Sequence, residues 1–215
     1  MTTETKIVTR VRFDQGLTVA EFLARAAVNR DKYERNYNRP VLAEEDLLFF
    51  RKAVAHPDGP GKLLAIAEPW CGDVYRELPT AVRIAEASGM DLRIFPRDEN
   101  PDVMDRFLSD GGARAIPVFV FYTVDMRYIA HFTERPASAH AGLAAAMEEA
   151  KAKLNLPAST LEDLPESERQ LLRLEVISRI KPYSDEWRKD TVKEIRQLLS
   201  DALELPLFRT VEPNP

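Results

Sequence analysis

One cysteine is the residue of this chain with the clearest chemical potential. Cys71 lies in the segment 68–74, after an apolar stretch at residues 63–67 and before a helical pattern that begins near Gly72. The first N–H groups of a helix have no partners within it and carry partial positive charge, so here they would face the sulfur atom. Because a thiolate is stabilised at such a position, Cys71 is a candidate nucleophile.

The residues around this cysteine resemble the active-site motif of the thioredoxin family. Trp70, Cys71 and Gly72 match its Trp-Cys-Gly, and Pro79 stands eight residues after the cysteine, where the family's active-site helix carries a proline. Residues 98–101 resemble the family's loop before its third helix. The resemblance implies a thioredoxin-like α/β fold, in which a mixed central sheet is flanked by helices.

A second segment of the chain extends the resemblance. Residues 112–117 resemble the family segment that ends in a cis-proline, which predicts a cis peptide bond between Ile116 and Pro117 opposite Cys71. Such a bond leaves the Ile116 backbone outside the sheet ladder, where an extended peptide can pair with it. The family's glycine after the last strand aligns with Thr133, which alters the substrate groove. The resemblance thus implies Cys71 as the catalytic residue and a substrate-binding set of Trp70, Gly72, Asp73, Ile116, Pro117 and Thr133.

The chain departs from the family pattern at the second thiol. Asp73 and Val74 stand where the family has proline and its second cysteine, so no internal disulfide can form. The family's buried acidic residue falls on Ala65. Since Asp73 and Glu68 would both oppose a negative sulfur, we expect a Cys71 pKa between about 7 and 8.5, nearer the upper value.

Two classes of function fit these residues. In the first, the chain is a single-thiol oxidoreductase that acts on protein disulfides or glutathione adducts through a mixed disulfide at Cys71. In the second, it is a redox-inactive thioredoxin-like module that binds peptides or proteins. A thiol that senses peroxide by forming sulfenic acid also stays open. None of these functions needs a cofactor.

The composition limits the classes of binding partner that we expect. The chain has 215 residues, 45% of them hydrophobic, and a formal net charge of −5 with interspersed basic residues, so we expect no nucleic-acid partner. It shows no signal-peptide pattern at the N-terminus and no apolar run of membrane-spanning length, which predicts a cytoplasmic protein without a membrane partner. His56, His131 and His140 lack metal-ligand spacing, so no metal site is expected.

Periodicity divides the chain into three parts. Residues 1–42 are expected to form an extension, with a half-buried strand over residues 6–13 and a helix that begins at Val19 after the capping box of Thr18 and Glu21. This helix could continue to Asn38.

Residues 43–154 are expected to form the thioredoxin-like core, closed by a helix over residues 138–154. Residues 155–215 should add two helices, one near Pro165 and one after Ser184, packed on the core. A partner-binding arm is the alternative reading of these helices.

Overall fold

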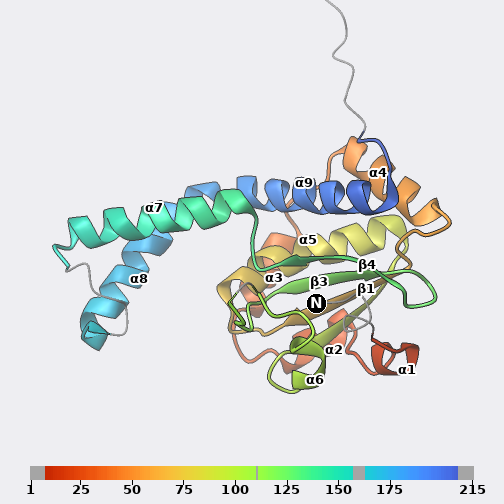
Figure 1. The fold of residues 1–215 in the computed structure, drawn as a ribbon. Helices are drawn as coiled ribbons and strands as arrows, with labels where there is room; N and C mark the ends of the chain where they lie inside the picture. Colours follow the sequence, from red (N-terminus) through yellow and green to blue (C-terminus); the bar gives the residue numbers. More distant parts are fainter. Residues whose placement is uncertain (1–7, 110, 157–162, 208–215) are drawn as a thin grey trace, which may run out of the picture.

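The computed structural model describes residues 8–109, 111–156 and 163–207. Within them, a four-stranded mixed sheet lies between helices, as the sequence predicted (Figure 1). The strands follow the order β2 (Asp91–Pro96), β1 (Lys62–Ala67), β3 (Val118–Tyr122) and β4 (Tyr128–Thr133). Strand β1 is parallel to β2 and antiparallel to β3, and β3 is antiparallel to β4.

Helices cover both faces of this sheet. The helices of the described residues are α1 (Arg10–Phe13), α2 (Val19–Arg25), α3 (Arg30–Tyr37), α4 (Glu44–Ala55), α5 (Gly72–Ser88), α6 (Pro101–Met104), α7 (Ala137–Lys153), α8 (Glu166–Ile180) and α9 (Ser184–Leu203), with a 3-10 turn at Lys181–Tyr183. Helices α4, α5 and α9 lie on one side, and α1, α2 and α6 on the other (Figure 1). The resulting core buries all of β1 and β3.

The N-terminal strand expected over residues 6–13 is wrong for the part that the structure describes. Residues Arg10–Phe13 form the short helix α1, in which the Thr9 side chain accepts a hydrogen bond from the Arg12 backbone N–H at 3.2 Å. This cap stabilises a helical turn. Within this turn, Phe13 is fully buried, whereas Val11 is 73% exposed. Residues 1–7 lie outside the described part of the chain.

The capping box at Thr18 is confirmed, but the helix does not continue to Asn38. Helix α2 ends at Arg25 because Ala26 is extended, with ψ 105°, and α3 begins at Arg30 after Asn29, which is left-handed with φ 61°. The Asn29 side-chain amide donates to the Pro69 carbonyl oxygen at 2.9 Å. The break therefore places a polar side chain against the segment that carries the cysteine.

Strand β1 and helix α5 position the motif. All six residues of β1 are buried, so the end of the strand, where the motif begins, is held in a fixed position. Helix α5 begins at Gly72 and ends at Ser88. Its C-cap residue Gly89 has a φ of 80°, which lets its N–H donate to the Ala85 carbonyl oxygen at 2.8 Å. A residue with a side chain would be strained at that φ.

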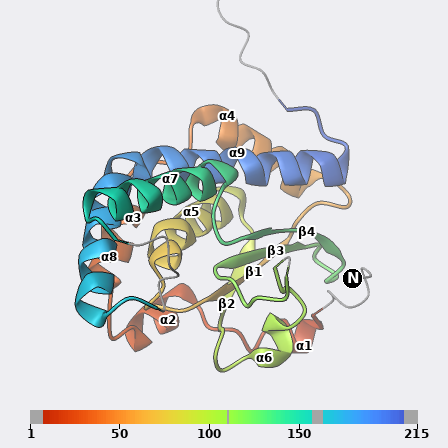
Figure 2. The ribbon, with the colours of Figure 1, turned by 60° about the vertical axis from the view of Figure 1, so that its left-hand side comes forward.

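The C-terminal helices differ in what they contact. Helix α9 places Val192, Ile195, Leu199 and Leu203 in the main core. Helix α7, expected to close that core, instead packs with α8 in a separate apolar cluster of Ala146, Ala150, Leu164, Leu172 and Val176. Figures 1 and 2 show α7 and α8 extending beyond the sheet. No helix of the described residues is long and apolar enough to cross a membrane.

Candidate functional site

Cys71 lies at the N-terminus of α5, facing the segment before β3. Cys71 is the N-cap residue of the helix, and its thiol donates to the Ile116 carbonyl oxygen, with 3.6 Å between sulfur and oxygen. The peptide bond between Ile116 and Pro117 is cis. Both the helix start and the cis bond agree with the sequence prediction, and together they bring the thiol to the backbone of a segment 45 residues away.

The pKa of the Cys71 thiol is raised above its ordinary value, and burial is the main cause. The Asp73 carboxylate also raises this pKa, while the backbone N–H groups of Val74 and Asp73 and the Arg135 guanidinium lower it. The expected pKa of about 7 to 8.5 is therefore wrong in direction, because removing a thiolate from water outweighs the helix N-terminus here. At neutral pH the thiol is protonated and donates to Ile116.

Glu68 does not oppose the thiolate as expected. Its side chain accepts a hydrogen bond from the Asp98 backbone N–H at 2.9 Å, on the loop after β2. Burial raises the pKa of the Glu68 carboxyl group, while the Asp98 N–H works in the opposite direction. Glu68 therefore ties β1 to that loop.

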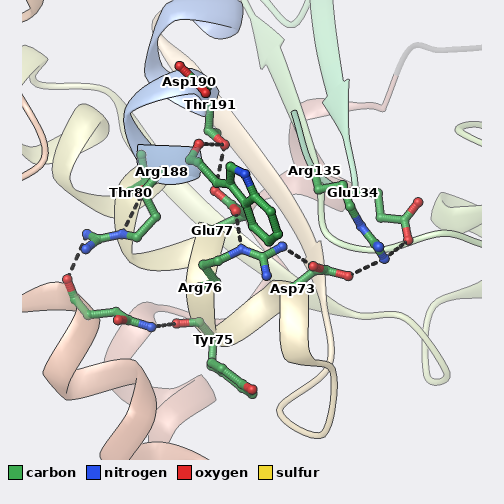
Figure 3. A network of polar contacts seen from close by, with 12 residues as sticks. Asp73, Tyr75, Arg76, Glu77, Thr80, Glu134, Arg135, Arg188, Asp190 and Thr191 are labelled. Carbon is green, nitrogen blue, oxygen red and sulfur yellow. Dashed lines mark hydrogen bonds and ion pairs between the residues drawn. The ribbon is translucent and has the colours of Figure 1, made fainter. Parts of the chain in front are cut away.

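Asp73 is held between two arginines. It accepts from Arg135 at 2.6 Å and forms an ion pair with Arg76, and the side chains of Asp73, Arg76 and Arg135 are only 14%, 10% and 14% exposed (Figure 3). Arg135, which follows β4, also pairs with its neighbour Glu134. Ion pairs this deeply placed are costly to break, because the remaining charge stays away from water.

The network continues from Asp73 through α5 to α9. The Arg76 Nε atom donates to Glu77 at 2.7 Å, and the hydroxyl group of Thr191 on α9 donates to the other Glu77 oxygen at 2.7 Å. Glu77 is fully buried, and this burial raises the pKa of its carboxyl group. The Arg76 guanidinium also lies over the Trp187 ring, 5.4 Å from its centroid. Figure 3 shows these side chains converging from both helices.

Arg188 makes a second link between α9 and α5. Its side chain is 1% exposed and donates to the Asn36 carbonyl oxygen at 2.8 Å and to the Thr80 hydroxyl at 3.4 Å (Figure 3). Sequence reasoning missed these residues and the Arg76 and Arg135 pairs. The one signal was the spacing of Asp73 and Arg76, which fits an i,i+3 pair on a helix.

A family model described as thioredoxin matches residues 16–152, which are more than half of the chain. The chain belongs to the thioredoxin family. No curated protein sequence matches this thioredoxin-family chain.

Two crystal structures resemble the fold of this thioredoxin-family chain. An HIV epitope scaffold has a TM-score of 0.58 and 15% identity, and the match covers 91% of this chain and 99% of the scaffold. A protein of unknown function from Pseudomonas aeruginosa has a TM-score of 0.53 and 18% identity, and the match covers 82% and 99% of the two chains. At these identities the likeness shows the fold alone.

The structure places the other predicted site residues of this thioredoxin-family chain as follows. Trp70 is 52% exposed, and the Arg97 guanidinium lies 4.8 Å from its ring centroid. Thr133 ends β4 and is the register partner of Val118 at the start of β3. A Cβ atom at Gly72 would meet no heavy atom closer than the Tyr75 hydroxyl at 3.6 Å, so close packing does not require a glycine there.

Metal binding finds no support at this site. In the described ranges, no group of three or more His, Cys, Asp or Glu side chains is arranged to hold a metal ion. His131 on β4 is hydrogen-bonded through Nδ1 to the Tyr128 hydroxyl at 2.6 Å, and its ring lies 5.5 Å from that of Phe107. These contacts give His131 a packing role within the sheet.

Proposed function

We propose that this chain is a single-thiol oxidoreductase whose Cys71 exchanges with protein disulfides or glutathione adducts. One observation carries the proposal: Cys71 is the N-cap residue of α5, and its sulfur lies 3.6 Å from the Ile116 carbonyl oxygen. Ile116 precedes the residues of β3 that pair with β1. An extended substrate that pairs with the Ile116 backbone would bring its sulfur next to Cys71.

Reduction of a protein disulfide needs three thiol–disulfide exchanges, whereas release of a glutathione adduct needs two. Cys71 first loses its proton to solvent, and the thiolate attacks one sulfur of the substrate disulfide. A bond forms between Cys71 and that sulfur, the substrate S–S bond breaks, and the departing thiolate takes up a proton. A first glutathione thiolate then attacks the Cys71 sulfur of the mixed disulfide and releases the second substrate thiol. A second glutathione attacks the resulting Cys71–glutathione disulfide, forms oxidised glutathione and returns Cys71 as a thiol. Two glutathione-equivalents are oxidised for each protein disulfide reduced.

The raised pKa sets the rate of this exchange. Only the thiolate attacks a disulfide, and the half-buried thiol, with its raised pKa, supplies little thiolate at neutral pH. The proposed enzyme is therefore slow at pH 7 and faster at alkaline pH. The N–H groups of Asp73 and Val74, which favour the thiolate, supply the stabilisation that remains.

The test is adduct formation with oxidised glutathione. The full chain is incubated with oxidised glutathione at pH 7 and pH 9, and its intact mass is measured before and after treatment with reduced glutathione. We expect one adduct on Cys71, faster at pH 9, that reduced glutathione removes. The Cys71→Ser variant is the matched control and should stay unmodified. A wild-type chain that remains unmodified at both pH values contradicts the redox proposal.

The second candidate is a binding module, and the protonated thiol favours it. A half-buried S–H group that donates to Ile116 is a packing contact, which a serine hydroxyl could replace. In that case a peptide still pairs with the Ile116 backbone, and no covalent bond follows. A peptide library screened against wild type and Cys71→Ser separates the two functions. Equal peptide binding by both proteins, with no glutathione adduct on the wild type, supports the module.

A further inference from the structure

Helix α8 has two apolar faces, and only one of them packs against α7. Leu172 and Val176 point into the cluster shared with α7. On the opposite face, Leu171, Leu174 and Ile177 are 55%, 60% and 54% exposed. Surface leucines are common one at a time, whereas three on successive turns of one helix form a continuous stripe. We call Leu171, Leu174 and Ile177 the α8 stripe.

The α8 stripe lies on the part of the molecule that extends beyond the sheet. Figures 1 and 2 show α7 and α8 as an arm at one end of the fold, with α8 on its outer edge. The outer face of α8 is therefore accessible to another molecule without displacing any described element. Its 15 residues span about 22 Å, which is enough for a helix–helix contact.

The residue spacing within the α8 stripe is symmetric about Leu174. Leu171 and Ile177 stand three residues before and after Leu174. If a second copy of α8 lies antiparallel with Leu174 on the two-fold axis, Leu171 faces Ile177 of the second copy, and the two Leu174 side chains meet. An isologous two-fold interface requires this self-complementarity.

Charges at the two ends of α8 favour the same antiparallel arrangement. Glu166 begins the helix and Lys181 directly follows its end, and both are exposed. The Glu166 side chain also pairs with Arg169 at 2.7 Å while remaining 70% exposed. In the antiparallel pair, Glu166 lies opposite position 182 of the second copy, next to Lys181, and the helix dipoles oppose one another. A parallel pair would instead place like charges together.

We propose that the α8 stripe binds a second copy of this chain, forming a two-fold dimer with antiparallel α8 helices. The chemistry at Cys71 is not needed for this inference, because it depends on the arm alone. With three apolar side chains from each copy, the contact is smaller than a standard interface, and a dissociation constant in roughly the micromolar range is expected.

Sedimentation equilibrium of the full chain, from about 1 to 200 µM, tests the dimer. Wild type should show a monomer–dimer equilibrium, and Leu174→Glu should weaken it at least about tenfold, because two carboxylates would meet on the two-fold axis. Circular dichroism confirms that the variant stays folded, as expected for an exposed position. Leu48→Glu is the matched control, since Leu48 is 55% exposed on α4, and it should dimerise like wild type.

A charge exchange tests the antiparallel register. Glu166→Lys and Lys181→Glu should each weaken dimerisation, because each places like charges across the interface. The double variant Glu166→Lys/Lys181→Glu should restore it, a result that neither an unrelated partner nor a packing defect would give. A wild-type chain that stays monomeric overturns the proposal, as does a double variant no better than the single ones. Binding of the monomer to anionic lipid vesicles would assign the stripe to a membrane surface and likewise overturn it.

Discussion

The Asp73 carboxylate accepts a hydrogen bond from Arg135 at 2.6 Å, across 62 positions of sequence. This pair connects the first turn of the cysteine-bearing helix to the segment after β4. Because Arg76 holds the same carboxylate from the other side, the negative charge nearest to Cys71 is both fixed in place and partly compensated. The acidity of the thiol therefore depends on residues outside its own motif.

Replacing Asp73 by asparagine should lower the pKa of Cys71. The carboxylate raises this pKa by repelling the thiolate, and its removal also leaves the charge of Arg135 without its partner. The pH dependence of iodoacetamide alkylation measures the change, with the alkylation curve moving to lower pH. Asp125→Asn, in the exposed β3–β4 turn, is the control and should leave the curve in place. A curve unmoved in Asp73→Asn would show that the carboxylate is fully neutralised by its arginines.

Replacing Arg135 by glutamine should act in the opposite direction. The guanidinium lowers the pKa of Cys71, so its loss should raise that pKa further and slow alkylation at pH 7 to 8. Arg127→Gln is a matched control, since Arg127 is 61% exposed and pairs with Asp58. Faster alkylation in Arg135→Gln would contradict the assignment of Arg135 as a cation that acts on the thiol.

The raised pKa of Cys71 also predicts a loss of stability at alkaline pH. Because the folded-state pKa lies above the unfolded value of about 8.5, the unfolded chain releases its thiol proton first. The stabilising contribution is complete below about pH 8.5 and is lost as pH rises through the folded-state pKa. Urea unfolding between pH 7 and pH 10 should show a steeper decline for wild type than for Cys71→Ser. Buried tyrosines contribute equally to both proteins, so parallel curves would refute the prediction.

The Thr191 hydroxyl should contribute to stability through Glu77. Thr191→Val removes the 2.7 Å hydrogen bond to a fully buried carboxylate, which should lower the free energy of unfolding by about 1.5–3 kcal/mol. Thr191→Ser keeps the hydroxyl and serves as the control, with a smaller loss from the missing methyl group. Urea denaturation at pH 7 measures both. Equal losses in the two variants would show that packing, and not the hydrogen bond, is what Thr191 supplies.

The local part of the site could be predicted from the sequence. Cys71 and the helix start are adjacent in the chain, and the Ile116–Pro117 segment carries its own motif, so both were readable. The partners of Asp73 were not, because Arg135 reaches it only through the tertiary fold. The acidity of Cys71 was mispredicted for a related reason: charges can be read from neighbours in sequence, whereas burial depends on the packed structure.

In two elements, tertiary packing overrides what the sequence pattern predicted. Alternation over residues 6–13 indicated a strand, yet the Thr9 cap and the burial of Phe13 give a helical turn at Arg10–Phe13. The Ala-rich helix α7 was predicted from propensity, but propensity does not say what a helix packs against. Its place beside the core is taken by α9, and the expected division at residues 42 and 154 stays a prediction.

The buried bond between Thr191 and Glu77 also bears on the order in which the protein can fold during synthesis. Helix α5 emerges from the ribosome long before α9, and domains generally fold as units in the direction of synthesis. Until α9 emerges, Glu77 lacks its hydroxyl partner and β4 lacks the helix that contacts it. We therefore expect the thioredoxin-like portion to close only after α9 has been synthesised, and a nascent chain that stalls before Thr191 to expose apolar surface.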